Sequence, residues 1–265
     1  MRRPRKVHFG LAIVALFALA ALLAPLLAPY DPNHQELLAR LSGPSSQHLL
    51  GTDDVGRDNL SRLLYATRMD LPVALLAVLF PFLIGMVVGC LAGYYGGLVD
   101  TAVTRVADVV QAFPVYVLIL ALIAVLGTGA RSIVLASTIV SWVAYARLAR
   151  GEVLRVRGRD YVAAARMGGL KTRRILARHV LPNVIAQPVV YFMSDMVALV
   201  LTLSALSFLG LGIPAPTAEW GRMIADAQPY IASDAWLILP PGLAIVLLGV
   251  GFSLIADGLD DRFRA

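Results

Sequence analysis

The side chains that could carry out chemistry are few in this sequence and widely separated. Its only cysteine, Cys90, lies inside an apolar run, so neither an intrachain disulfide nor a cysteine metal cluster can form. The two lysines, Lys6 and Lys171, belong to no GxxxxGK[ST] sequence, so the chain cannot cradle ATP phosphates by that mechanism. The histidines show no HExxH or paired spacing, which argues against a metalloenzyme. They are His8, His34, His48 and His179.

Asp195 is the ionisable residue nearest to the interior of an apolar run. An intramembrane enzyme would need paired carboxylates, a histidine pair or a serine with a base, whereas Asp195 stands alone. A gated channel would need rings of charge or a filter sequence in a self-associating chain. Because burying a charge in a membrane is costly, Asp195 is a candidate for a transport role, with an interfacial position near the inner end of its span as the alternative.

A second candidate is the basic stretch "RDYVAAARMGGLKTRRILARHVLPN", residues 159–183. Its pattern predicts a helix, a break at Gly168 and Gly169, and a second helix stopped by Pro182. This shape would expose a small-residue knob, Ala163 to Ala165, between cations. Such a knob suits docking into a groove on another protein, and the alternative is binding of anionic lipid headgroups by the arginines. The apolar residues that we expect to fold back onto the bundle are Leu170, Ile175, Leu176 and Val180.

The composition identifies the elements that must position these residues. The chain has 265 residues, of which 58% are hydrophobic and 15% charged, and its mean hydropathy is +0.75. Soluble domains carry roughly 25% charged residues, so this is the composition of an integral membrane protein. The net charge of +6 does not indicate nucleic-acid binding, because the basic residues flank apolar runs and form no stripe with interleaved aromatics.

Six uncharged windows predict an all-α, polytopic membrane protein with six transmembrane helices. The fourth window is short, but arginines at both ends can extend its reach by snorkelling. The fifth should begin earlier than its window, near Ala186. The windows are 9–30, 71–99, 109–130, 132–146, 196–218 and 235–256.

The distribution of basic residues predicts the orientation. With the N-terminus inside, 17 of the 23 Lys and Arg residues fall on the cytoplasmic side, which places both termini in the cytoplasm. A cleaved signal peptide is the alternative for the first span, but its apolar run is longer than a usual signal sequence. We expect residues 1–69 to form this helix and an extracytoplasmic connection, and residues 70–265 to form a five-helix core with a cytoplasmic loop at about 147–185.

Three further patterns concern helix packing, an amphipathic helix and the outer connection between the first two spans. Gly85, Gly89 and Gly93 recur every fourth residue, so a second helix can approach closely, from this chain or from a partner subunit. Polar residues at near-helical spacing after Gly97 predict an amphipathic helix that ends at Pro114. In the outer connection, "GTDDVGRD" has the composition of turns, and it lacks the Asp spacing and distal Glu of a calcium loop.

The basic stretch, together with four others, resembles a known protein family. "YVAAARMGGLKTRRILARHVLPN" is similar to the cytoplasmic EAA loop of bacterial binding-protein-dependent ABC importer permeases, in which Glu-Ala-Ala is followed at fixed spacing by Gly and Leu-Pro. Ala164, Ala165 and Gly169 match, and Ala163 replaces the Glu. His179, Leu181 and Pro182 follow at the expected spacing. Four further stretches agree in order, including "GYYGGLVDTAVTRVADVVQAFP" and "LSFLGLGIPAPTAEWGRMI", and resemble the dipeptide, oligopeptide and nickel branch.

The resemblance implies a type I ABC importer permease fold and a transporter subunit of the bacterial inner membrane that is not itself an enzyme. It implies a heterodimer with a homologous permease, two ATP-binding subunits that bind ATP and Mg, an extracytoplasmic binding protein and surrounding lipid. This chain itself would bind no cofactor and no metal. Short peptides are the expected substrate, with nickel chelates, glutathione or haem as alternatives.

Site residues follow from the same resemblance. The coupling helix that docks on the ATPase would comprise Ala163, Ala164, Ala165, Arg166, Gly168, Gly169 and Leu170, supported by His179, Leu181 and Pro182. On the outside, we expect Trp220, Arg222, Asp53 and Arg57 to contact the binding protein. Asp195 and the glycines Gly85, Gly89 and Gly93 are candidates for the path or for packing.

Overall fold

The computed structural model describes residues 4–263, and within these residues every regular element is helical. The all-α prediction is therefore confirmed. The elements are α1 (Pro4–Leu27), α2 (Asn59–Tyr95), α3 (Gly97–Gln111), α4 (Val115–Leu126), α5 (Ala130–Val156), α6 (Asp160–Met167), α7 (Thr172–Ile175), a π-helical turn η2 (Leu176–Val180), α8 (Leu181–Val184), α9 (Ala186–Phe208), α10 (Trp220–Ala227) and α11 (Leu239–Phe263), with 3₁₀ turns at Leu37–Ala39, Gln228–Tyr230 and Ala235–Leu237.

Five helices of the described chain are long and apolar enough to cross a membrane by themselves: α1, α2, α5, α9 and α11. The expected third span is different. It is a pair, α3 and α4, that bends by 82° at the break between them. The break follows from the sequence, because Pro114 precedes α4 and disfavours helical geometry in the residue before it. The six expected spans are thus five helices and one bent pair.

Several helices begin or end away from their predicted limits. α9 ends at Phe208, ten residues before the end of its window at residue 218. α2 starts at Asn59, twelve residues before the apolar window, because the side chain of Asp58 accepts a hydrogen bond from the backbone amide of Ser61 and caps the helix. α5 extends to Val156, past the window that ends at residue 146. Its arginines are held there by α3, since Arg147 Nη2 lies 3.0 Å from an oxygen of Asp108 and Arg150 Nη2 lies 2.7 Å from an oxygen of Asp100. The amphipathic helix α3 therefore turns its acidic residues toward α5.

The glycines of α2 bring α5 into close contact within the same chain. A Cβ placed on Gly85 would lie 2.5 Å from the carbonyl oxygen of Trp142, and one on Gly93 would lie 3.0 Å from that of Arg150. Gly89 is packed equally tightly against Ala146. No side chain larger than hydrogen fits at such a separation, so the spacing of the glycines fixes the pairing of α2 with α5.

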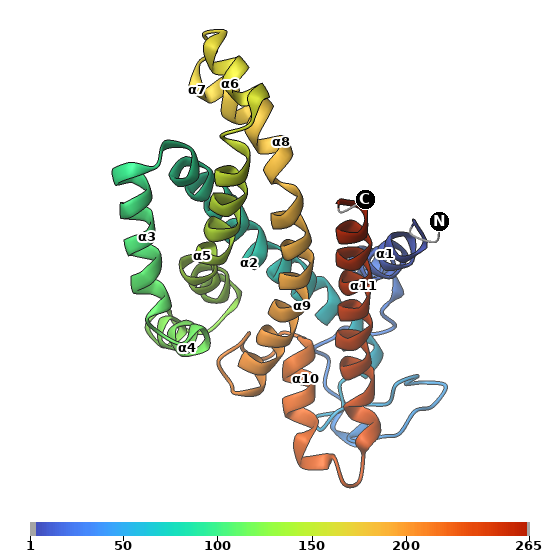
Figure 1. Ribbon diagram of the computed structural model, residues 1–265. Coiled ribbons are helices and arrows are strands. Elements are labelled where there is room, and N and C mark those ends of the chain that lie inside the picture. The colour runs from blue at the N-terminus through green and yellow to red at the C-terminus, as the bar shows by residue number, and fades with distance from the viewer. Residues whose placement is uncertain (1–3, 264–265) are drawn as a thin grey trace.

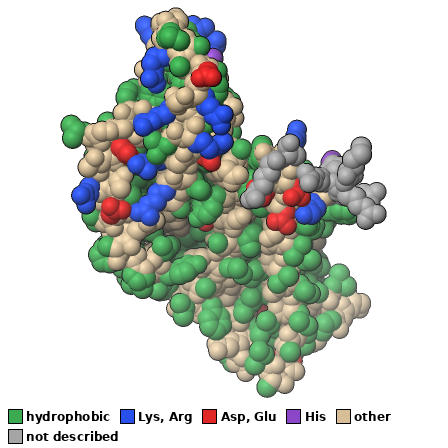
Figure 2. All heavy atoms as spheres, in the orientation of Figure 1, with side chains coloured by type: hydrophobic (Ala, Val, Ile, Leu, Met, Phe, Trp, Pro, Cys, Tyr) green, Lys and Arg blue, Asp and Glu red, His purple; other side chains and the backbone are tan. Residues whose placement is uncertain are grey.

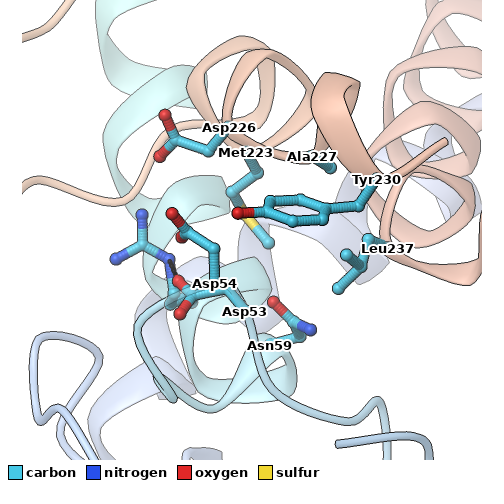
Figure 3. Close-up of a pocket in the computed structure, with 9 residues that line it drawn as sticks. Asp53, Asp54, Asn59, Met223, Asp226, Ala227, Tyr230 and Leu237 are labelled. Carbon is cyan, nitrogen blue, oxygen red and sulfur yellow. Dashed lines mark ion pairs between the residues drawn. The ribbon is translucent and has the colours of Figure 1, made fainter. Parts of the chain in front are cut away.

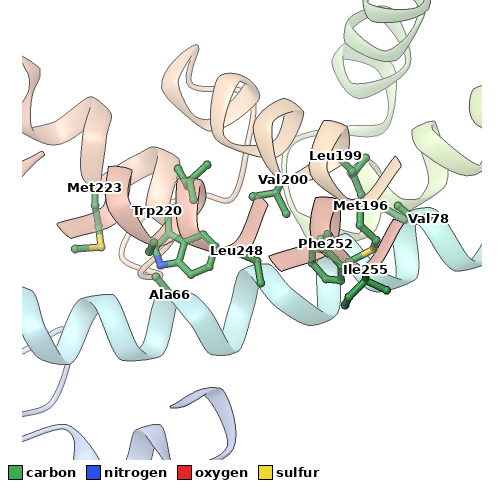
Figure 4. Close-up of a cluster of buried hydrophobic side chains, with 14 of the residues drawn as sticks. Ala66, Val78, Met196, Leu199, Val200, Trp220, Met223, Leu248, Phe252 and Ile255 are labelled. Atoms are coloured by element: carbon green, nitrogen blue, oxygen red, sulfur yellow. The ribbon is translucent and has the colours of Figure 1, made fainter. Parts of the chain in front are cut away.

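A buried apolar cluster joins α2, α5, α9, α10 and α11. Trp220 at the start of α10 is wholly buried in it, beside Leu248 of α11 and Val200 of α9 (Figure 4). The ring of Phe17 in α1 meets the indole edge to face, with ring centroids 5.9 Å apart. The first helix thus packs onto the same core as the last.

The two ends of the bundle differ in charge. α6 and α7 project from one end, and α10 lies near the opposite end (Figure 1). Lysine and arginine side chains gather over the end that carries α6 and α7, while the opposite end shows mostly apolar and neutral atoms on the face in view (Figure 2). The start of α1 and the end of α11 lie away from α10 (Figure 1). The basic loop, the start of α1 and the end of α11 therefore all lie away from α10.

Candidate functional site

The projecting loop between α5 and α9 begins with α6 and a tight turn. The amide of Gly168 donates to Ala164 O at 2.9 Å, and the amide of Leu170 donates to Ala165 O at 3.2 Å. Gly169 adopts φ +74°, a left-handed conformation that side chains other than glycine rarely take. The glycine pair therefore ends α6 as the sequence predicts, and it reverses the chain toward α7.

One side of this loop is anchored to the membrane helices. Val162, Ala165, Ile175 and Val180 are buried in a cluster with Val153 of α5, and Leu170 and Leu176 pack against it. The predicted return of the apolar residues onto the bundle is confirmed. Ala165 therefore faces inward and does not belong to an exposed knob.

The other side of the loop is exposed. Ala163 and Ala164 face solvent, and Met167 is 83% exposed. Arg166 is exposed as well, with its guanidinium 5.6 Å from the ring centroid of Tyr94 in α2. An apolar methionine tip flanked by alanines and arginines is a surface that suits a groove on another protein.

The second half of the loop differs from its prediction. Pro182 does not stop the helix, because it lies in the first turn of α8, where a missing amide costs little. The preceding π-turn Leu176–Val180 changes the register so that the chain stays helical. His179 is half-buried, and its carbonyl accepts a 2.8 Å hydrogen bond from Asn183 Nδ2. Leu181 and Pro182 are exposed.

The loop is also tied directly to α2 by an arginine. Arg157 Nη1 donates a 2.9 Å hydrogen bond to the carbonyl of Gly93. Together with the contact of Arg166 and Tyr94, this bond holds the base of the loop at the end of α2. A displacement of the loop must therefore act on α2 as well as on the helices that it connects covalently.

At the opposite end, an ion-pair cluster joins the outer connection to α10. Arg57 Nε lies 2.6 Å from Asp53 Oδ2, and Arg57 Nη2 lies 3.7 Å from Asp226 of α10. Arg62 approaches the same Asp53 oxygen at 3.5 Å. Figure 3 shows Asp53 and Asp54 facing Asp226 across a narrow hollow. Burial, with the neighbouring charges of Asp53 and Asp226, raises the pKa of Asp54.

The start of α10 is fixed by two acidic groups. Glu219 caps the helix, since its side-chain oxygens accept from the amides of Gly221 at 2.9 Å and Arg222 at 2.7 Å. Asp70 of α2 accepts from the amide of Trp220 at 3.0 Å. Burial raises the pKa of Glu219. The acidic pair therefore anchors the segment that carries the tryptophan.

The expected outer contact residues occupy different environments. Trp220 is wholly buried and Asp53 and Arg57 are nearly so, which leaves their side chains out of reach of a partner on the surface in this conformation. The turn-rich sequence around Trp220 indicated a surface segment, but Gly221 lets α10 approach Ser204 of α9 so closely that the indole enters the core. Arg222 is one-third exposed and remains a candidate contact.

Asp195 belongs to α9, and its side chain points toward α5. Its Oδ2 accepts a 2.7 Å hydrogen bond from the hydroxyl of Tyr145, a residue that sequence reasoning did not single out. The two residues are 50 positions apart, and no local pattern connects them. Within residues 4–263, no group of three or more His, Cys, Asp or Glu side chains is arranged to hold a metal ion.

Comparisons with known proteins agree along nearly the whole chain. Residues 85–265 match the family described as binding-protein-dependent transport system inner membrane component, and residues 2–44 match the N-terminal TM domain of oligopeptide transport permease C. A dipeptide transport system permease protein of Alkalihalophilus pseudofirmus is 39% identical over 98% of this chain and 86% of its own length.

Two further relatives carry different names. The nickel transport system permease protein of Escherichia coli K12 is 41% identical over 97% of this chain and 92% of that protein. The oligopeptide transport system permease protein of Bacillus subtilis is 36% identical over 98% of this chain and 85% of that protein.

Proposed function

Because this chain belongs to the family of binding-protein-dependent transport system inner membrane components, we propose that it forms half of the translocation path of an ATP-driven importer of short peptides. The peptide assignment is supported by the names of relatives that transport dipeptides, tripeptides or oligopeptides. A nickel chelate is the second candidate cargo, since the nickel permease is equally similar.

The proposed complex contains a homologous permease as the second half of the path, two ATP-binding subunits and an extracytoplasmic binding protein. ATP and Mg are bound by the ATP-binding subunits, and lipid of the bacterial inner membrane surrounds the spans. The basic loop lies in the cytoplasm with both termini, and α10 lies outside. The clustering of lysine and arginine at the loop end supports this orientation.

The observation that carries the proposal is the two-sided loop of residues 160–184. Its inner side is buried against α2 and α5, while Ala163, Ala164 and Met167 are exposed at its tip. We infer that this tip sits in a groove of an ATP-binding subunit, so that movement of the groove reaches the spans. Coupling of this kind requires that the loop bind differently in the inward and outward states.

The test is ATP hydrolysis by the reconstituted complex with and without the loaded binding protein. Gly169→Arg should assemble and lose the stimulation, because the new side chain obstructs the bend where it meets the groove. A Cβ at Gly169 has open space within this chain, so the obstruction would be intermolecular. Gly169→Ala separates this effect from backbone strain, which costs about 1–2 kcal/mol for a left-handed residue, and should retain most of the stimulation.

Gly158→Arg is the matched control, because Gly158 precedes α6, would have no atom within 4 Å of an added Cβ and has no left-handed φ. It should keep the stimulation. If Gly169→Arg hydrolyses ATP like the unaltered complex, the loop is a lipid-facing anchor and the docking proposal fails. Uptake of a labelled dipeptide compared with a nickel chelate by the same vesicles then decides between the two cargoes.

A further inference from the structure

A carboxylate lies deep within the membrane-spanning part of α9. Asp195 is the tenth residue of this 23-residue helix, so it lies about 14 Å along the axis from the start at Ala186. The hydrocarbon core of a bilayer is about 30 Å thick, which places the carboxylate near the middle of the membrane. If α9 spans the bilayer from end to end, Asp195 is therefore deeper than the interfacial position that the sequence allowed.

Few hydrogen bonds and no ion pair from the described residues offset the cost of burying the Asp195 carboxylate. Its Oδ2 accepts the hydrogen bond from Tyr145, while Oδ1 accepts none from the described residues. The ion pairs seen in residues 4–263 join other groups, and none includes Asp195. An ionised carboxylate at this depth is costly unless a cation or a polar path faces it.

Aromatic rings pack around Tyr145, the hydrogen-bond partner of the carboxylate. Tyr145 is itself wholly buried, so the half-buried ring of Tyr191, one helical turn before Asp195 in α9, is the one that a ligand could reach. The ring centroid of Tyr145 lies 5.0 Å from that of Tyr191 and 5.6 Å from that of Phe82. Aromatic faces attract organic cations, and a single carboxylate adds a full negative charge. A divalent metal would require several oxygen ligands, and the described residues offer no such group here. The site chemistry therefore matches an organic ammonium group.

The exposed face of α9 beside Asp195 is unlike a lipid-facing surface. Met196, Leu199 and Val200 point from α9 into the buried core (Figure 4). From Ser194 to Ala205 the outward face carries small or polar side chains with one leucine, in contrast to the leucine-rich outward face of α1, and Phe208 is exposed at the end of the helix. Its members are Ser194, Ala198, Leu201, Thr202 and Ala205. Small side chains of this kind let a helix of a neighbouring subunit approach closely, so this face suits the interface with the second half of the path.

We propose that Asp195, with Tyr145 and Tyr191, forms a mid-membrane subsite that holds the ammonium group of the cargo during its passage. This inference rests on the proposed function, because the N-terminus of a peptide has a pKa of about 7.7–8.0 and is largely cationic at neutral pH. One carboxylate attracts the cation without enclosing it, so the cargo can leave again, as transport requires. Tyr145 is a positioning residue that fixes the carboxylate through its hydrogen bond.

The experiment uses the complete transporter in proteoliposomes, with binding protein saturated with labelled dialanine. Two quantities are measured together: ATP hydrolysis stimulated by the loaded binding protein and dialanine accumulated in the vesicles. Asp195→Asn keeps the shape of the side chain and removes its charge. It should retain stimulated hydrolysis within about twofold and lower the dialanine imported per ATP about tenfold, the loss expected for one charge-assisted contact.

Matched variants separate the charge from packing. Ser194→Ala, on the same exposed face and without a carboxylate to lose, should import dialanine like the unaltered transporter. Tyr191→Leu keeps the carboxylate and removes one aromatic face, and should lower import severalfold. If Asp195→Asn does not assemble, Tyr191→Leu alone decides, and undiminished import by it overturns the subsite.

The outcomes also separate this inference from the proposed function. If the unaltered transporter hydrolyses ATP and imports no dialanine, the peptide assignment itself is wrong. If it imports dialanine and Asp195→Asn imports just as much, the peptide assignment stands and the subsite is wrong, because the charge of Asp195 then plays no part in transport.

Discussion

The guanidinium of Arg57 lies 3.7 Å from the carboxylate of Asp226, although 169 positions separate them in the chain. The same guanidinium holds Asp53 at 2.6 Å, so one side chain joins the outer connection to α10. Because these groups are mostly buried, their charges depend on one another. Removal of a single member leaves the remaining buried charges with fewer partners, which is costly.

Arg57→Ala should therefore destabilise the protein by about 3 kcal/mol, near the lower end for a broken buried pair, since Arg62 still faces Asp53. Thermal unfolding of the purified complex measures the loss. Lys6→Ala is the control, because Lys6 pairs with Asp261 at the exposed surface and should contribute less than about 1 kcal/mol. Equal shifts for both variants would contradict a buried, mutually dependent cluster.

The raised pKa of Asp54 predicts that the stability of the folded protein depends on pH. Its pKa is raised mainly by burial, and Asp53 and Asp226 add to the effect while Arg57 opposes it. The folded protein therefore binds this proton more tightly than the unfolded chain, so stability falls as the pH rises from about 3.9 through the raised pKa. The whole penalty is present once the pH is above the raised pKa.

Asp54→Asn, which resembles the protonated acid, should raise the Tm at pH 7 by about 1–3 °C. The gain should shrink as the pH approaches about 4, where the native Asp54 is itself protonated. Melting curves of both proteins at several pH values measure this difference. A gain that does not depend on pH would mean that burial of the Asp54 charge is not its cause.

The substitutions Gly89→Ala and Gly151→Ala should change the stability of the protein in opposite directions. A Cβ on Gly89 would lie 2.8 Å from Cα of Ala146, so Gly89→Ala must push α2 and α5 apart and should cost about 1–3 kcal/mol. Gly151 lies within α5 in open space, where an added Cβ would meet no other atom within 4 Å, and Gly151→Ala should stabilise the helix by about 0.5–1 kcal/mol. Unfolding temperatures of the two variants test the contrast, and a loss of similar size in both would argue against close helix packing at Gly89.

Substitution of Trp220 should affect the stability of the fold, whereas substitution of Arg222 should affect recognition of the binding protein. Trp220→Ala empties a wholly buried site and should cost about 3–5 kcal/mol. Arg222→Ala should preserve the fold, because Asp226 keeps Arg57 as a partner, and should weaken stimulation of ATP hydrolysis by the binding protein. Unchanged stimulation at all binding-protein concentrations would remove Arg222 from the contact surface.

Local patterns in the sequence predicted much of the fold because membrane spans and glycine bends leave local signals. The apolar windows located α1 and α11, and the expected start of the fifth span near Ala186 is confirmed by α9, although its window ran ten residues past the end of that helix. The double glycine located the turn after α6. These features depend on residues that are close together in the chain.

What the sequence did not predict depends on distant partners. Tyr145 meets Asp195 across two helices, and the burial of Trp220 depends on the contact of Gly221 with Ser204. Pro182 was expected to end a helix. The π-turn before it, which the sequence did not reveal, instead places the proline in the first turn of a new helix.

The 37-residue length of α2 has a mechanical consequence. Such a helix measures about 55 Å, nearly twice the roughly 30 Å of hydrocarbon that it must cross. Its first turns contribute Arg62 to the outer ion-pair cluster, and its last turns hold Arg157 and Arg166 of the opposite loop. A tilt of about 10° around its midpoint would move the two ends about 5 Å in opposite directions. α2 is thus one continuous helix, with Pro72 and Pro81 inside it, whose two ends contact groups on opposite sides of the apolar spans. A movement at one end can therefore be transmitted to the other.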